Sequence, residues 1–150
     1  ILSLEGDAPR GRLIYFSDNA RCRHCHQVDD PRQSLGPTLK EINRKYPRRG
    51  EFLQHVLKPS LKIEERYAAR IVATVDGRLL SGLLDRESPR EIVLRTVDKK
   101  ELTIARDDID QLQTSPRSLM PEFLLSDLTA QQAADLLAYL RSLGAAPTDR

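Results

Sequence analysis

The stretch Cys22-Arg23-His24-Cys25-His26 constrains this chain more than any other part of it. Two cysteines separated by two residues and followed directly by a histidine form the C-x-x-C-H pattern, the attachment signature of a c-type haem. Two thiols at this spacing can reach both vinyl groups of one porphyrin, and the adjacent histidine then lies under the ring, where its imidazole can bind iron. The pattern predicts one covalent haem c, attached through Cys22 and Cys25, with His26 as an iron ligand.

The two cysteines of this motif are the only ones in the chain, and this weighs against two other interpretations of the pattern. A closed zinc site needs four ligands, and the sequence has no second cysteine pair. His24 and His26 are too close to the cysteines to complete a strain-free tetrahedron with them. A dithiol redox site normally precedes a helix in a βαβ setting, a pattern that this sequence lacks.

Length and charge limit the remaining classes of protein. The chain has 150 residues and a formal net charge of +2, whereas a dedicated nucleic-acid binder is usually strongly basic. No apolar run is long enough to span a bilayer. Covalent haem attachment takes place on the oxidising side of the bacterial membrane, so we expect a periplasmic or otherwise exported protein. Because the chain begins at Ile1 without a methionine, we expect a mature form or a fragment of a longer polypeptide.

Helical patterns occupy both ends of the chain. Apolar spacing, proline positions and capping residues predict four helices, at about residues 9–19, 38–46, 50–57 and 130–143. The last is the strongest, because Thr129 and Gln132 have the spacing of a capping box.

The middle of the chain, from about residue 66 to 113, has the pattern of short strands. Asp76-Gly77 between two apolar segments is a strong signal for a tight hairpin, and alternating apolar residues continue beyond it. We expect strands at 69–75, 78–84, 91–97, 101–105 and 109–113. They predict a small twisted antiparallel sheet or partial barrel.

Met120 is the predicted second iron ligand. It is the only methionine in the chain and lies between Leu119 and Pro121, where the following proline disfavours a helical backbone. Methionine and histidine ligation together raise the reduction potential and suit electron transfer. The alternative is that Met120 only fills a gap in the core.

Two further stretches are candidates for contacts around the haem. A ligating histidine usually donates its other ring N–H to a carbonyl or carboxylate, and the loop Leu35-Gly36-Pro37 can supply such a carbonyl. Arg44 and Tyr46 lie in the most basic stretch and are candidates to bind the haem propionates. The alternative for these two residues is an ordinary solvated surface.

The order of these motifs resembles that of class I cytochromes c at both ends of the chain. The resemblance implies that the first and last helices cross. It also implies that His26 is the proximal ligand, Met120 the distal ligand and Pro37 the carbonyl partner of His26. The residues that it places at the helix crossing are Gly11, Tyr15, Leu136 and Tyr139.

The inserted strands separate the two ligands further than in an ordinary member of that family. The whole pattern is similar to the haem-binding domain at the C-terminus of large planctomycete membrane-bound dehydrogenase-like proteins. This similarity is carried by Val75-Asp76-Gly77-Arg78, Ser81-Gly82, Asp108-Ile109 and Ser118-Leu119-Met120-Pro121. The fold expected from it is mostly α, a single cytochrome c domain over residues 1–150 with a β insertion of about four to five strands at 66–113.

The function expected from these features is one-electron transfer by a haem module, without bond-making chemistry on a substrate. Its partner would be a redox protein or a dehydrogenase domain of the same polypeptide, and not a nucleic acid. One alternative is a gas-binding or sensory haem in which Met120 is displaceable, and another is a haem-free interaction module built on the sheet. Exposed strand edges in the insertion also favour a homodimer, although Arg70, Arg78, Arg86 and Arg90 oppose edge pairing.

Overall fold

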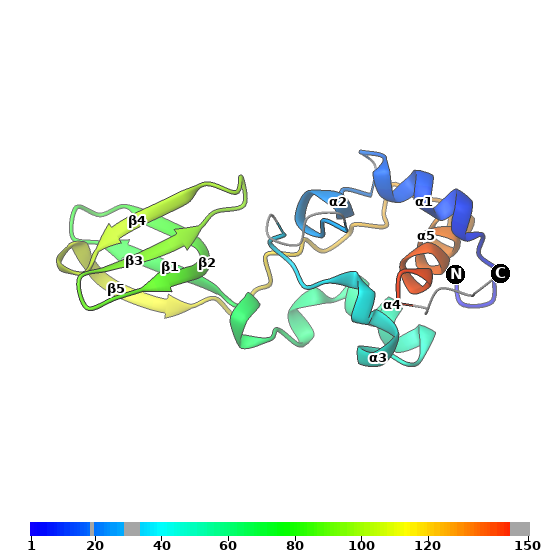
Figure 1. Ribbon diagram of the computed structural model, residues 1–150, viewed down its shortest axis with the longest axis horizontal. Helices are drawn as coiled ribbons and strands as arrows, with labels where there is room; N and C mark the ends of the chain where they lie inside the picture. Colours follow the sequence, from blue (N-terminus) through cyan, green and yellow to red (C-terminus); the bar gives the residue numbers. More distant parts are fainter. Residues whose placement is uncertain (19, 29–33, 145–150) are drawn as a thin grey trace. The chain divides into compact units, whose positions relative to one another are not determined.

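The computed structural model describes residues 1–18, 20–28 and 34–144. The chain divides into two compact units (Figure 1). One contains residues 1–61 and 121–150, and the other contains residues 62–120. The first is helical and the second is a β-sheet, so each is described by itself.

The helical unit contains three helices close to the ranges predicted from the sequence. These are α1 (Ala8–Phe16), α4 (Arg49–Leu57) and α5 (Ala130–Ser142). The predicted capping box of α5 is present, because the N–H of Gln132 donates to Thr129 Oγ1 (3.2 Å) and the N–H of Thr129 donates to Gln132 Oε1 (2.8 Å).

Shorter turns complete this unit. They are α2 (Cys22–Cys25), the 3₁₀ turn η2 (Leu39–Glu41), α3 (Ile42–Lys45) and the 3₁₀ turn η3 (Pro59–Leu61). The single helix predicted at 38–46 is therefore divided into η2 and α3. The turn η2 begins after Thr38, whose side chain accepts the N–H of Lys40.

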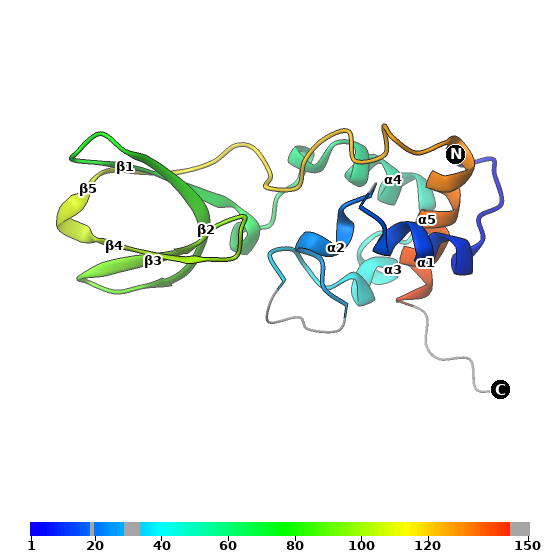
Figure 2. The ribbon, with the colours of Figure 1, turned by 90° about the horizontal axis from the view of Figure 1, so that it is seen from above.

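Helices α1 and α5 cross in direct contact (Figures 1 and 2). A Cβ atom on Gly11 would lie 1.9 Å from the carbonyl oxygen of Asp135, and one on Gly6 would lie 2.2 Å from that of Ala134. Only glycine permits this approach. The rings of Tyr15 and Tyr139 meet with their centroids 5.4 Å apart. The predicted crossing of the first and last helices is thus present.

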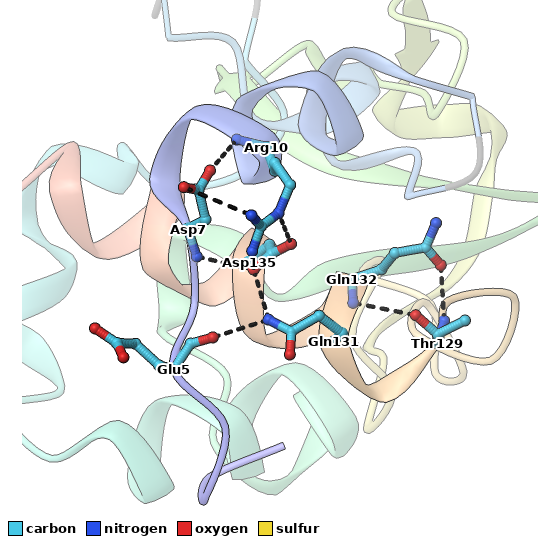
Figure 3. Close-up of polar contacts among 7 residues, drawn as sticks. All are labelled: Glu5, Asp7, Arg10, Thr129, Gln131, Gln132 and Asp135. Atoms are coloured by element: carbon cyan, nitrogen blue, oxygen red, sulfur yellow. Dashed lines mark hydrogen bonds and ion pairs between the residues drawn. The ribbon is translucent and has the colours of Figure 1, made fainter.

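A polar network joins the same two helices (Figure 3). The carboxylate of Asp135, which is 2% exposed, accepts hydrogen bonds from Arg10 Nε (2.8 Å), Arg10 Nη2 (3.1 Å) and the N–H of Asp7 (2.8 Å). Gln131 Nε2 donates to the same carboxylate (2.9 Å) and to the carbonyl of Glu5 (2.8 Å). These bonds hold the chain just before α1 against the first turns of α5.

The sheet unit is a five-stranded antiparallel sheet with the order β4-β3-β2-β1-β5. Its strands are β1 (Ala69–Thr74), β2 (Leu79–Glu87), β3 (Glu91–Arg95), β4 (Glu101–Ala105) and β5 (Ile109–Thr114). Short 3₁₀ turns, η4 (Glu65–Tyr67) and η5 (Arg106–Asp108), precede β1 and β5. Register shifts occur between Leu84 and Arg86 and between Ala73 and Thr74, and bulges of this kind increase twist. The sheet accordingly curls (Figure 2).

The sheet unit has a hydrophobic core of its own. Its fully buried members are Val72, Ile92, Leu94 and Ile104. The predicted hairpin at Asp76-Gly77 is present, with Gly77 at φ +84°. The last strand, β5, returns to pair with the first, so that Val72 lies opposite both Leu80 of β2 and Leu112 of β5.

The expected fold class, mostly α with a small β insertion, is wrong. Helix accounts for 37% and strand for 22% of the described residues, and the chain has a mixed helix and sheet architecture. The physical reason is that the strands do not depend on the helices to bury their apolar side chains. They form a five-stranded sheet with a separate hydrophobic core.

Within the described part of the chain, none of the helices has both the length and the apolar character needed to cross a membrane.

Candidate haem site

The short helix α2 carries both cysteines of the C-x-x-C-H motif. Cys22 and Cys25 are its first and last residues, and side chains three residues apart on a helical turn share a face. The N–H of His26 donates to the carbonyl of Cys22 (2.9 Å) and ends the turn. Arg21, immediately before it, has φ +53°, a left-handed conformation that redirects the chain into the helix. The motif is thus a compact unit with both thiols on one side.

The imidazole of His26 is held by the loop that contains Gly36 and Pro37. His26 Nδ1 lies 2.9 Å from the carbonyl oxygen of Pro37. A carbonyl can only accept, so Nδ1 carries the proton and the lone pair of the neutral ring is on Nε2. The contact implied by the family resemblance is therefore present, and Nε2 is the nitrogen suited to bind a metal.

Gly36 is packed directly against this ring. A Cβ atom there would lie 2.3 Å from His26 Cε1 and 2.7 Å from Nδ1, so any side chain would displace the imidazole. The N–H groups of Leu35 and Gly36 both donate to the carbonyl of Cys25, at 2.9 and 3.0 Å. The N–H of Gln27 donates to Ser34 Oγ (2.7 Å). These bonds join the two ends of the intervening loop, of which residues 29–33 lie outside the described part.

Tyr15 connects the motif to the helix crossing. Its ring is 1% exposed, and its hydroxyl donates a hydrogen bond to the carbonyl of His26. From the sequence, Tyr15 was expected only at the crossing of α1 and α5, and neither its contact with His26 nor that of Ser34 with Gln27 was predicted. The spacing of seven residues between Tyr15 and Cys22 does not indicate the contact with His26, because α1 ends and the chain turns between them.

The electrostatics of the site favour neutral groups. Burial lowers the pKa of His26, and the hydrogen bond to Pro37 only partly opposes this effect. At neutral pH the imidazole is therefore uncharged and able to donate its lone pair. Burial, with a smaller contribution from Cys25, raises the pKa of the Cys22 thiol to about 11. Cys22 thus remains a thiol at neutral pH, and a protonated thiol is a poor nucleophile for disulfide exchange.

These residues fit a covalently attached haem better than a zinc ion or a redox dithiol. A haem needs two thiols on one face beside an oriented neutral imidazole, and Cys22, Cys25 and His26 have that arrangement. A closed zinc site needs four ligands, and the sequence has only this one cysteine pair. No group of three or more histidine, cysteine or acidic side chains with the geometry for a metal ion occurs among the described residues.

The other predicted site residues have contacts of their own. The guanidinium of Arg44 is exposed and pairs with Glu41 (2.7 Å). The ring of Tyr46 stacks on the imidazole of His55, with centroids 4.9 Å apart. Their predicted contact with haem propionates stays a prediction.

Met120 is the last residue of the sheet unit, and the helical unit resumes at Pro121. Its side chain is half-buried, and its N–H donates to Ser118 Oγ (3.1 Å). As the sequence pattern indicates, it lies outside any helix.

The chain matches no protein-family model and no curated protein.

Proposed function

We propose that this chain is a c-type cytochrome module that carries one haem attached through Cys22 and Cys25. His26 is the proximal ligand and Met120 the distal ligand in this proposal. The observation that carries it is the imidazole of His26, which is oriented by the carbonyl of Pro37 at 2.9 Å and packed on Gly36, directly beside two cysteines of one helical turn.

The residues around His26 orient it and keep it neutral. The carbonyl of Pro37 selects the tautomer with Nε2 unprotonated and makes that nitrogen a better electron donor. Tyr15 and the N–H groups of Leu35 and Gly36 bind the carbonyls of His26 and Cys25, so the backbone of the motif is restrained. When bound, the haem supplies one-electron exchange between ferric and ferrous iron. A restrained ligand set suits that role, because it changes little between the two oxidation states.

The partner in this proposal is a redox protein or a dehydrogenase domain of the same polypeptide, and the module itself catalyses no reaction on a substrate. An exported location follows from the proposed covalent haem, because such attachment takes place on the oxidising side of the membrane. No nucleic-acid partner is proposed. The predicted association of two copies through the sheet stays a prediction.

Expression in a host competent for haem maturation tests the attachment. We expect the intact mass to increase by one haem, and expect Cys22→Ala and Cys25→Ala to lose the stable two-bond attachment. Ser126→Ala provides the control, because the hydroxyl of Ser126 binds the carbonyl of Phe123 in a turn outside the motif. A wild-type chain that takes up no covalent haem would contradict the proposal.

The ferric absorption spectrum tests the distal ligand. We expect a sulfur-to-iron charge-transfer band in the wild type that disappears in Met120→Ala and persists in the neighbouring control Leu119→Ala. A band that persists in Met120→Ala contradicts ligation by this residue. Rapid and tight binding of carbon monoxide by the untreated ferrous wild type would instead favour a gas-binding haem.

A further inference from the structure

The segment between the last strand and Met120 is anchored to the sheet. The N–H of Ser115 donates to the carbonyl of Ala69 (2.8 Å), which continues the pairing of β5 with β1 by one residue. Ser115 Oγ then accepts the N–H of Arg117 (3.1 Å) and donates to the carbonyl of Arg117 (3.0 Å). These three bonds determine the path of the backbone as it leaves the sheet.

A second serine holds Met120 itself. Ser118 Oγ accepts the N–H of Met120 at 3.1 Å, and both residues are half-buried. Pro121 follows and restricts Met120 to extended backbone conformations. The amide of Met120 is thus bound on one side and its carbonyl leads into a proline on the other, so the backbone that carries the thioether has little freedom.

We propose that Ser118 is the positioning residue of Met120, the proposed distal iron ligand. This inference rests on the proposed ligation of iron by Met120. A methionine with a restrained backbone loses less conformational entropy when it binds than a mobile one does. Restraint by Ser118 therefore raises the equilibrium constant for binding of the thioether to iron. An external ligand must displace the thioether, so its apparent dissociation constant rises in proportion.

Imidazole is a suitable probe, because it competes with methionine for ferric iron and its binding can be followed in the Soret and charge-transfer bands. Loss of one hydrogen bond of this kind corresponds to a change of roughly three- to tenfold. We expect Ser118→Ala in the full haem-loaded chain to lower the dissociation constant for imidazole by this factor. Ser118→Thr, which keeps the hydroxyl, should remain within about twofold of the wild type.

Ser126→Ala is the matched control. Ser126 lies six residues beyond Met120 in another turn, where its Oγ donates to the carbonyl of Phe123 (2.7 Å). Its removal deletes a comparable serine hydrogen bond without touching the amide of Met120. We expect its imidazole affinity to equal that of the wild type.

The outcomes separate this inference from the proposed function. If the wild type has the charge-transfer band but Ser118→Ala binds imidazole no more tightly than Ser126→Ala, the positioning role is overturned and ligation by Met120 stands. A wild type without the band overturns the ligation by Met120 and, with it, the positioning role of Ser118. Tighter binding in Ser118→Ala that Ser118→Thr reverses supports the inference.

Discussion

At the scale of single residues, the orientation of His26 depends on the residue type at one neighbouring position. The imidazole lies against the backbone of Gly36, and its Nδ1 donates to the next carbonyl, that of Pro37. The glycine has no φ in the left-handed region that would explain its presence. Its role is to leave room for the ring.

Gly36→Ala is expected to displace the imidazole of His26 from Pro37. The added methyl group would lie 2.3 Å from His26 Cε1, so the ring or the loop must move, and overpacking of this kind costs about 1–3 kcal/mol. We expect a lower free energy of unfolding and, in the haem-loaded protein, a ferric absorption spectrum with a larger high-spin fraction.

Gly50→Ala is the control for this substitution. A Cβ atom at Gly50 has Leu2 Cδ1 as its nearest neighbour at 3.7 Å, an ordinary contact, and alanine favours the helix α4 more than glycine does. Its spectrum should match that of the wild type. Equal spectra for both variants would show that Gly36 has no part in orienting His26.

At the scale of elements, α1 and α5 are joined by close backbone packing at glycines and by hydrogen bonds to a buried carboxylate. Gly6 and Gly11 let the backbones approach closely, and this approach encloses the carboxylate of Asp135. Burial of a carboxylate is costly unless it is paired and hydrogen-bonded. Arg10, Gln131 and the N–H of Asp7 supply those bonds (Figure 3).

Asp135→Asn is expected to lower the free energy of unfolding at pH 7 by about 1.5–3 kcal/mol, the range for hydrogen bonds to a charged group. The hydrogen bonds from Arg10 hold the pKa of Asp135 well below its usual range, although burial acts in the opposite direction. The carboxylate of the folded protein therefore stabilises it above the unfolded pKa of about 4. This contribution is lost as the pH falls below that value.

Chemical denaturation of the haem-loaded protein at pH 7 and pH 3 measures this effect. We expect the difference between Asp135→Asn and the wild type to be smaller at pH 3. The control is Asp127→Asn, which removes an exposed carboxylate from the segment before α5. A difference that is the same at both pH values, or absent at pH 7, would contradict the proposed role of the charge.

At the scale of the whole molecule, the chain consists of two compact units. Cys22, Cys25, His26 and Pro37 belong to the helical unit, and Met120 is the last residue of the sheet unit. The sheet unit also has its own core around Val72. Attachment of the haem and ligation by methionine should therefore be separable.

Replacement of residues 62–120 by a flexible linker of about ten residues tests this separation. We expect the shortened chain still to carry one covalent haem, measured by intact mass, because the cysteines, His26 and Pro37 are retained. We expect its ferric spectrum to lack the charge-transfer band, as in full-length Met120→Ala. A shortened chain without covalent haem, expressed beside a wild type that has it, would contradict this division of roles.

Local patterns in the sequence identified much of this protein correctly. The helices α1, α4 and α5, the capping box at Thr129 and the hairpin at Asp76-Gly77 depend on residues a few positions apart, so their signals are readable in one stretch of chain. The C-x-x-C-H motif is local in the same way. The need of a ligating histidine for a carbonyl partner pointed to the loop Leu35-Gly36-Pro37, and the resemblance to a family singled out Pro37, 11 residues from His26.

The remaining features were decided by contacts between distant residues. The periodicity of each strand does not show that β5 pairs with β1, or that the sheet has a hydrophobic core of its own. For this reason the sheet was predicted as a small insertion in a mostly α fold, and the predicted fold class was wrong. Nothing around Asp135 in sequence indicates that its carboxylate is buried against Arg10, 125 residues away. The sequence by itself determined the elements whose signals are local, and it contains the C-x-x-C-H motif on which the proposed haem attachment rests. The tertiary structure decided which backbone groups orient His26 and how Met120 is anchored, because those groups meet only after the chain has folded.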